Sequence, residues 1–291
     1  MSKKVKEWTV LSMLEWATEY FKEKDIPDPR HSIEWLLAET LDIKRLDLYL
    51  KYDRPLSPGE LEKLRPMVKR RAQHEPLQYI IGFTDFMNAR ISVDPSVLIP
   101  RIETEQLVEI ILDRHSSSQS HKESLNVLDI GTGSGCIPIA LKMEHPDWDL
   151  WGIDISEKAL QTARQNAQQN EVDISFKKGN ILKPKSIPVN AQFDVIVSNP
   201  PYITPDEKTT LEPQVYQFEP SEALFTEDMD LMYGSILEFA QKNLSDNGKL
   251  YLELHEHFAK NIQQLFHRNS WNTTLLKDYD KKERFLIVHP E

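Results

Sequence analysis

The sequence predicts an α/β protein, in which a doubly wound, mostly parallel sheet follows a small helical bundle. Beyond residue 124, short apolar segments alternate with amphipathic segments, an order typical of a parallel sheet covered by helices. Residues 1–75 instead carry their apolar residues at helical spacing. The last two apolar segments are joined by a charged turn so short that they must pair antiparallel.

The N-terminal part is expected to contain three helices. Two apolar stripes lie on either side of Asp28-Pro29, and a third segment begins at Ser57 with a capping-box pattern and Pro58 at its first helical position. Three cations, Lys69 to Arg71, close this third helix. They are expected to be solvated and favoured by the helix dipole, and a docking patch for an acidic or nucleic-acid partner is the alternative.

Residues 82–100 change to a period near two, which predicts a hairpin that connects two domains. Residues 115–123 are expected to form an exposed loop. The expected strands of the sheet are 126–130, 150–155, 174–177, 193–198, 249–255, 273–279 and 284–289, and the helices between them lie near 135–145, 157–170, 229–244 and 257–268. The predicted domains are therefore 1–81, which is helical, then the hairpin 82–100, then 101–291, which carries the sheet.

Charge is unevenly distributed along the chain. The net charge is −11, with +1 in residues 1–90 and −12 in residues 91–291. An acidic larger part argues against direct binding of nucleic acid and suits a small molecule or a basic protein. Cys136 is the single cysteine, no apolar run is long enough to span a membrane, and the basic start is not followed by a signal-like segment. A cytoplasmic protein without a bound metal is expected.

A glycine-rich turn follows the first strand of the sheet, at Gly131-Thr132-Gly133-Ser134-Gly135. Such a turn lets a ligand approach the backbone closely. Asp154 ends the next strand, where a carboxylate can accept hydrogen bonds from both ribose hydroxyls. Cys136 stands where a dinucleotide fingerprint would have glycine, and Asp129 can accept from a cationic amino-acid end. These residues predict a nucleoside site, and packing of the turn is the alternative.

The fourth strand stops at Asn199-Pro200-Pro201-Tyr202. Two prolines cannot continue a strand ladder, so this corner is expected at the rim where the glycine turn and Asp154 also lie. Asn199 and the Pro200 carbonyl can accept the two N–H groups of a planar nitrogen, and Tyr202 can pack against its plane. Methyl transfer to an amide or exocyclic amine needs this positioning and no strong base.

The glycine turn, Asp154 and the terminal antiparallel pair together resemble S-adenosylmethionine-dependent methyltransferases. This resemblance implies a Rossmann-like, seven-stranded methyltransferase sheet, S-adenosylmethionine as cofactor and S-adenosylhomocysteine as product. It also implies that Asn180 and Ile181, after the third strand, border the adenine, although many relatives carry Asp at the Asn180 position. A turn residue is the plainer interpretation of Asn180.

Segments outside the sheet resemble the release-factor glutamine methyltransferases, the HemK/PrmC family. The matching stretches are Glu75–Gly82, Val97–Glu105 and Phe218-Glu219-Pro220 with Ala223-Leu224. The resemblance implies methylation of the glutamine side chain in the Gly-Gly-Gln loop of peptide chain release factors, with the helical domain helping to hold the factor. Glu103 and Glu105 are candidates to line the site, although acids are also favoured by the dipole at a helix start.

Several alternatives keep part of this pattern. The same chemistry on a glutamine of a ribosomal protein preserves the Asn199 corner, and a nucleic-acid base methyltransferase is disfavoured because no basic target-recognition region is visible. A nicotinamide dehydrogenase is disfavoured by Cys136. In a non-catalytic binding module, replacement of Asn199 would have no consequence.

Overall fold

The computed structural model describes residues 7–116, 124–189 and 191–290. The chain forms two compact units, residues 1–82 with 212–218, and residues 83–211 with 219–291. The loop expected at 115–123 lies largely outside the described residues, because only 115 and 116 are described and they still belong to a helix. Among the described residues, no helix is both long and apolar enough to cross a bilayer.

The smaller unit is helical, as the apolar spacing predicts. Its elements are α1 (Val10–Lys22), α2 (Pro29–Leu41), the 3-10 helix η1 (Arg45–Leu50), α3 (Pro58–Arg71), α4 (Leu77–Ile81) and, from the distant segment, α8 (Pro213–Tyr216). Thr9 and Ser57 cap α1 and α3 with the reciprocal bonds of a capping box. The stripes of α1 and α2, including Leu14, Phe21 and Leu37, are fully buried in one apolar core.

Arg71 corrects the expectation that the three cations at the end of α3 are solvated. Its side chain is 3% exposed, and its guanidinium donates to the Ser32 hydroxyl, to the Glu75 carbonyl and to Oε1 of Gln214 at 3.1, 2.9 and 3.0 Å. Burial lowers its pKa to about 10. Arg71 therefore fastens residues 212–218 to the helical unit.

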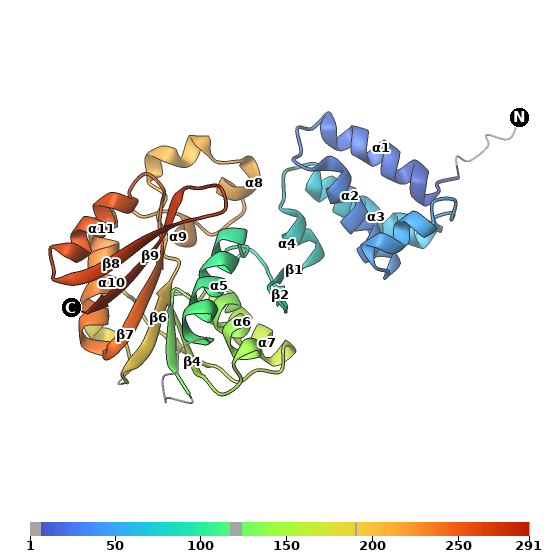
Figure 1. Cartoon of the computed structure of the whole chain (residues 1–291). Coiled ribbons are helices and arrows are strands. Elements are labelled where there is room, and N and C mark those ends of the chain that lie inside the picture. The colour runs from blue at the N-terminus through green and yellow to red at the C-terminus, as the bar shows by residue number, and fades with distance from the viewer. Residues whose placement is uncertain (1–6, 117–123, 190, 291) are drawn as a thin grey trace, which may run out of the picture. The chain divides into compact units, whose positions relative to one another are not determined.

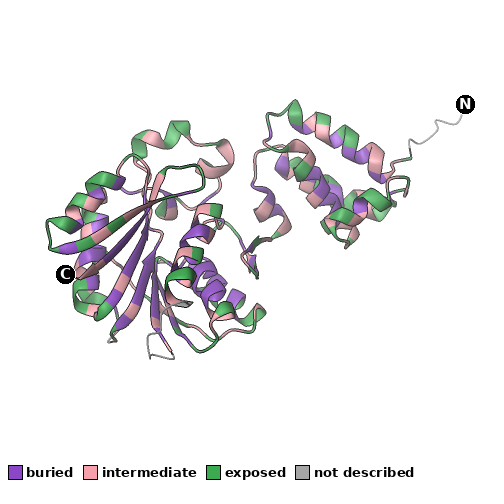
Figure 2. Ribbon diagram, in the orientation of Figure 1, coloured by how far each residue is buried: buried purple, intermediate pink, exposed green. Residues whose placement is uncertain are grey.

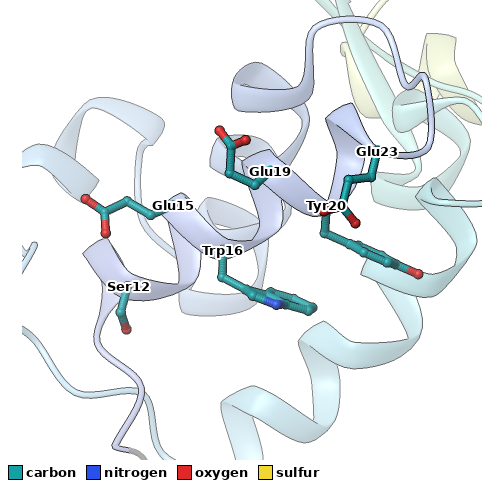
Figure 3. Close-up of a pocket in the computed structure, with 6 residues that line it drawn as sticks. All are labelled: Ser12, Glu15, Trp16, Glu19, Tyr20 and Glu23. Atoms are coloured by element: carbon teal, nitrogen blue, oxygen red, sulfur yellow. The ribbon is translucent and has the colours of Figure 1, made fainter.

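The outward face of α1 carries an exposed aromatic stack. The rings of Trp16 and Tyr20 are nearly parallel, with centroids 5.4 Å apart, and Trp16 is 44% exposed. Figure 3 shows both rings projecting from the same side of α1; Glu15, Glu19 and Glu23 of this helix line the same shallow pocket. This face combines apolar area with negative charge.

The larger unit contains a seven-stranded mixed sheet with the order β5-β4-β3-β6-β7-β9-β8. Its strands are β3 (Asn126–Ile130), β4 (Asp149–Asp154), β5 (Ser175–Lys178), β6 (Phe193–Ser198), β7 (Leu244–Glu253), β8 (Trp271–Lys277) and β9 (Glu283–Pro290). The first five strands pair in parallel, and β9 is antiparallel to both β7 and β8. The doubly wound sheet and its antiparallel end are confirmed.

Helices cover both faces of this sheet (Figure 1). One layer contains α5 (Ile102–Ser116), α6 (Cys136–Glu144) and α7 (Glu157–Gln169), and the other contains α10 (Met229–Asn243) and α11 (Ala259–His267). The strands between the layers are mostly buried, as Figure 2 shows. The expected hairpin also forms, from β1 (Phe83–Phe86) and β2 (Ala89–Ser92), within the larger unit.

Two parts of the larger unit differ from the sequence prediction. β7 begins at Leu244 rather than 249, because Leu244 pairs with Phe193 before an irregularity in the ladder. Residues between β6 and α10 form the short helices η3 (Pro205–Thr210) and α9 (Ser221–Leu224), which the sequence analysis did not assign. The second difference matters more, because this segment borders the site.

Candidate active site

A cavity of about 880 Å³ lies at the carboxyl ends of β3, β4 and β6. β3 and β6 are neighbours in the sheet although β4 and β5 lie between them in the chain. The connections leave in opposite directions at that point, which is where open α/β sheets bind ligands. The predicted site residues that line the cavity are Gly131, Gly133, Asp154, Asn180, Ile181, Asn199, Pro200 and Pro201.

The glycine turn forms one side of the cavity. Gly131, Gly133 and Gly135 all have positive φ, at 74°, 52° and 79°, a region that residues with a Cβ disfavour. The Gly131 and Thr132 amides donate to the Ile153 carbonyl, so the turn is held against the end of β4. The other three residues of the turn, Thr132, Ser134 and Gly135, are buried and do not line the cavity.

Asp129 lies under this turn in β3, is 1% exposed and does not itself line the cavity. Neither carboxylate oxygen has a hydrogen-bond partner among the described residues, and the nearby Thr132 hydroxyl is also unpaired. Burial raises the pKa of Asp129 to about 7; the nearby Thr132 hydroxyl opposes this rise, and the charge of Asp154 adds to it. An unpaired buried carboxylate is costly unless a donor or a cation reaches it, so Asp129 is suited to a positively charged ligand group.

Asp154 holds the turn and also faces the cavity. Its two oxygens accept from the Gly133 and Ser156 amides at 2.9 and 2.8 Å. Burial raises the pKa of its carboxyl, and the two backbone donors oppose that rise. Each oxygen can accept more than one hydrogen bond, so Asp154 retains capacity for ligand hydroxyls.

Asn180 and Ile181 lie on the wall beyond β5. The Asn180 side-chain oxygen accepts from the Leu182 amide at 2.9 Å, which is the local bond of an Asx turn. Asn180 thus fills the turn role and lines the cavity at the same time.

The Asn199 corner lies at the opposite side of the same cavity. The pairing of β6 with both neighbours ends at Ser198, so the Pro200 carbonyl lies beyond the ladder, as expected from the two prolines. Asn199 and Pro200 border the cavity directly. Tyr202 is half-buried and does not line it, because its hydroxyl turns toward Glu253 at 3.0 Å.

A polar network behind Asn199 was not predicted. Asn199 Nδ2 donates to the Thr104 hydroxyl at 3.0 Å, and that hydroxyl donates to Glu253 Oε2 at 2.8 Å. Neither Thr104 nor Glu253 was predicted as a site residue. Glu103 does not line the cavity, and Glu105 instead accepts from the Met87 amide of the hairpin.

The remaining wall is formed by the segment after the corner. The Ile203 amide donates to the Leu224 carbonyl, and the Thr226 amide donates to the Ile203 carbonyl. Buried Glu219 accepts from Arg101 at 2.5 Å and from the Ile99 amide at 3.2 Å. These bonds hold residues 96–98 and 220–232, which contribute most of the wall that the sequence did not reveal.

Comparisons with known proteins identify the two parts of the chain. A model described as "Methyltransferase domain" matches residues 121–285, and one described as "PrmC N-terminal domain" matches residues 12–82. The hMettl16 catalytic domain, solved in complex with the MAT2A 3'UTR hairpin 6, shares the fold. Its TM-score is 0.51 at 15% identity, covering 70% of this chain and 76% of that one. The fold and the matched domain define an S-adenosylmethionine-dependent methyltransferase.

Curated relatives narrow the class to one family. A release factor glutamine methyltransferase of Flavobacterium psychrophilum is 41% identical over 273 residues, covering 92% of this chain and 93% of the relative. Its counterpart in Geobacter sulfurreducens is 37% identical, covering 93% of each. The chain belongs to the release factor glutamine methyltransferase family.

Proposed function

We propose that this protein transfers a methyl group from S-adenosylmethionine to the side-chain amide nitrogen of the glutamine in the Gly-Gly-Gln motif of peptide chain release factors. The observation that carries the proposal is the Asn199-Pro200 corner, which borders the same cavity as the glycine turn and Asp154. The relatives named for this reaction align with almost the whole chain.

The cofactor fits the side of the cavity formed by β3 and β4. Asp129 offers an unpaired buried carboxylate for the cationic amino-acid end, and the glycines leave room for close approach to the backbone. Asp154 would accept from the ribose hydroxyls, and Asn180 and Ile181 would border the adenine. When bound, S-adenosylmethionine supplies an electrophilic methyl on a sulfonium; S-adenosylhomocysteine is the expected product.

The acceptor amide fits the opposite side. The Asn199 Nδ2 is turned to Thr104, so its Oδ1 is directed away from that bond and can accept one N–H of the glutamine amide. The Pro200 carbonyl accepts the other, Pro201 confines the plane of the group, and Tyr202 supports the corner through its bond to Glu253. Holding both N–H groups aims the nitrogen along the axis of transfer. Once methylated, the nitrogen is strongly acidic and releases one proton to solvent, so no strong base is needed.

The domain division belongs to the same proposal. Residues 1–81 would dock the release factor, the hairpin at 82–100 would connect, and residues 101–291 would carry the reaction. The aromatic and acidic face of α1 offers a docking surface of suitable chemistry for a basic protein (Figure 3). The net charge of −12 on residues 91–291 likewise favours a basic partner over nucleic acid.

The test is incubation of the purified protein with methyl-labelled S-adenosylmethionine and, separately, release factor, ribosomal proteins or DNA. Label is expected on the release factor, at the Gly-Gly-Gln glutamine by mass spectrometry. A release factor with that glutamine replaced by alanine is the matched control and should take no label. Label on ribosomal proteins or DNA without label on release factor would overturn the proposal.

A further inference from the structure

A chain of three hydrogen bonds joins the corner to a buried acid. Asn199 Nδ2 donates to Thr104, Thr104 donates to Glu253, and the Tyr202 hydroxyl donates to the other Glu253 oxygen at 3.0 Å. Thr104 is 3% exposed and Glu253 is fully buried. The residues come from the first turn of α5, the end of β6 and the last position of β7.

The direction of each bond follows from the acid. An ionised carboxylate only accepts, so the single hydroxyl proton of Thr104 is committed to Glu253. Toward Asn199, the Thr104 oxygen can then only accept a hydrogen bond. An asparagine amide presents either two donors or an acceptor, and only its nitrogen end can satisfy this oxygen.

We propose that Glu253, acting through Thr104, is a positioning residue that fixes the Asn199 amide with its oxygen toward the acceptor nitrogen. This inference rests on the proposed function. If the amide were reversed, its N–H groups would face the N–H groups of the substrate amide, and neither set could be satisfied. The same carboxylate anchors the Tyr202 hydroxyl, so one buried charge orients both polar side chains of the corner.

Protonation of Glu253 removes the directional constraint. A carboxylic acid can donate to Thr104, which frees the Thr104 proton to donate to Asn199 and stabilises the reversed amide. Burial raises the pKa of Glu253 to about 7; the Thr104 and Tyr202 bonds and the charge of Arg284 oppose this rise, and Glu103 adds to it. Another titratable neighbour, Tyr233, donates its hydroxyl to the Glu253 backbone carbonyl and has a raised pKa.

The experiment measures kcat for release-factor methylation at saturating cofactor, with the cofactor Kd measured separately by calorimetry. Thr104→Val, which keeps the shape and removes the hydroxyl, should lower kcat at least about tenfold and leave the cofactor Kd within about threefold. Thr104→Ser should restore most of the loss. Tyr233→Phe is the matched control. It removes a buried hydrogen bond to the Glu253 backbone carbonyl, which does not belong to the Asn199–Thr104–Glu253 network, and kcat should stay near that of the wild type.

The pH profile supplies a readout that does not depend on a deleted bond. Wild-type kcat should fall as pH drops below about 7, and Glu253→Gln should lose this limb because its side chain cannot titrate in that range. Equal kcat for Thr104→Val and wild type, or an unchanged acid limb in Glu253→Gln, would overturn the inference. Absence of release-factor methylation by the wild type would overturn the proposed function instead, so the two failures are distinguishable.

Discussion

Two of the buried carboxylates in the larger unit, those of Asp129 and Glu253, occupy different surroundings. Among the residues that the structure describes, neither oxygen of Asp129 has a hydrogen-bond partner, whereas Glu253 lies behind the Asn199 corner and accepts from two hydroxyls. Burial raises the pKa of both to about 7. A similar pKa shift thus accompanies two different hydrogen-bonding states.

Burial alone therefore does not determine the role of a carboxylate. A buried acid without donors has unused capacity, which a cationic ligand group can satisfy from outside. A buried acid with donors has used that capacity to orient its neighbours. The first is suited to bind a ligand, and the second is suited to position side chains that do so.

The largest effect is expected at the corner. Asn199→Ala removes an acceptor for the substrate amide, so methyl transfer should fall by about 100-fold or more, a loss typical of deleting one positioned polar group. Cofactor affinity, measured by calorimetry, should change only a few-fold because the glycine turn is untouched. Unchanged turnover in this variant would remove the corner from the mechanism.

A smaller effect, on affinity, is expected at the turn. Asp129→Asn removes the charge that would meet the cationic end of the cofactor, and the cofactor Kd should rise about tenfold. Calorimetric titration with S-adenosylhomocysteine, which carries the same amino-acid end, measures this directly. The exposed acid Asp173 provides the control, since Asp173→Asn should leave the Kd unchanged. Equal affinities for both variants would refute the assignment of Asp129.

The pH dependence of the free energy of unfolding should also distinguish Asp129 from a solvated acid. Its folded pKa of about 7 exceeds the unfolded value of 3.8, so the folded state holds the proton longer and loses stability as pH rises. Between pH 6 and 8 the wild type should lose about 1.4 kcal/mol more than Asp129→Asn. Urea titrations of the ligand-free proteins at the two pH values measure the difference, and parallel losses would contradict it.

The smallest effect is expected for the phenol at the corner. Tyr202→Phe keeps the ring and removes its bond to Glu253, so kcat should fall by only about two- to fivefold. Tyr202→Ala should fall further because the ring is lost as well. Identical losses in the two variants would mean that the hydroxyl, rather than the ring, carries the whole contribution.

Much of the fold was accessible from sequence because it repeats a local pattern. All seven strands were placed within a few residues, and the glycine turn was predicted because its positive φ angles require a residue without a Cβ. The cavity-lining glycines and the Asn199 corner followed from where strands end. Each of these features depends on a few consecutive residues.

The rest depends on contacts between distant residues. Thr104, Asn199 and Glu253 are separated by dozens of positions, and nothing local to any of them indicates that they share hydrogen bonds. Arg71 looked like a solvated helix-end cation because its partner Gln214 is 143 residues away. The wall at 203–228 has only short helices, which leave no periodicity to detect.

The assignment of residues 212–218 to the helical unit has a consequence for modularity. The chain passes between the two units three times, near residues 82, 211 and 218, rather than once. The N-terminal helices are therefore not a complete module by themselves. If they were transplanted alone to another enzyme, the buried Arg71 guanidinium would lose its hydrogen bond to the Gln214 oxygen. A graft that preserves the helical unit has to carry a second stretch of chain, taken from the segment that follows the Asn199 corner.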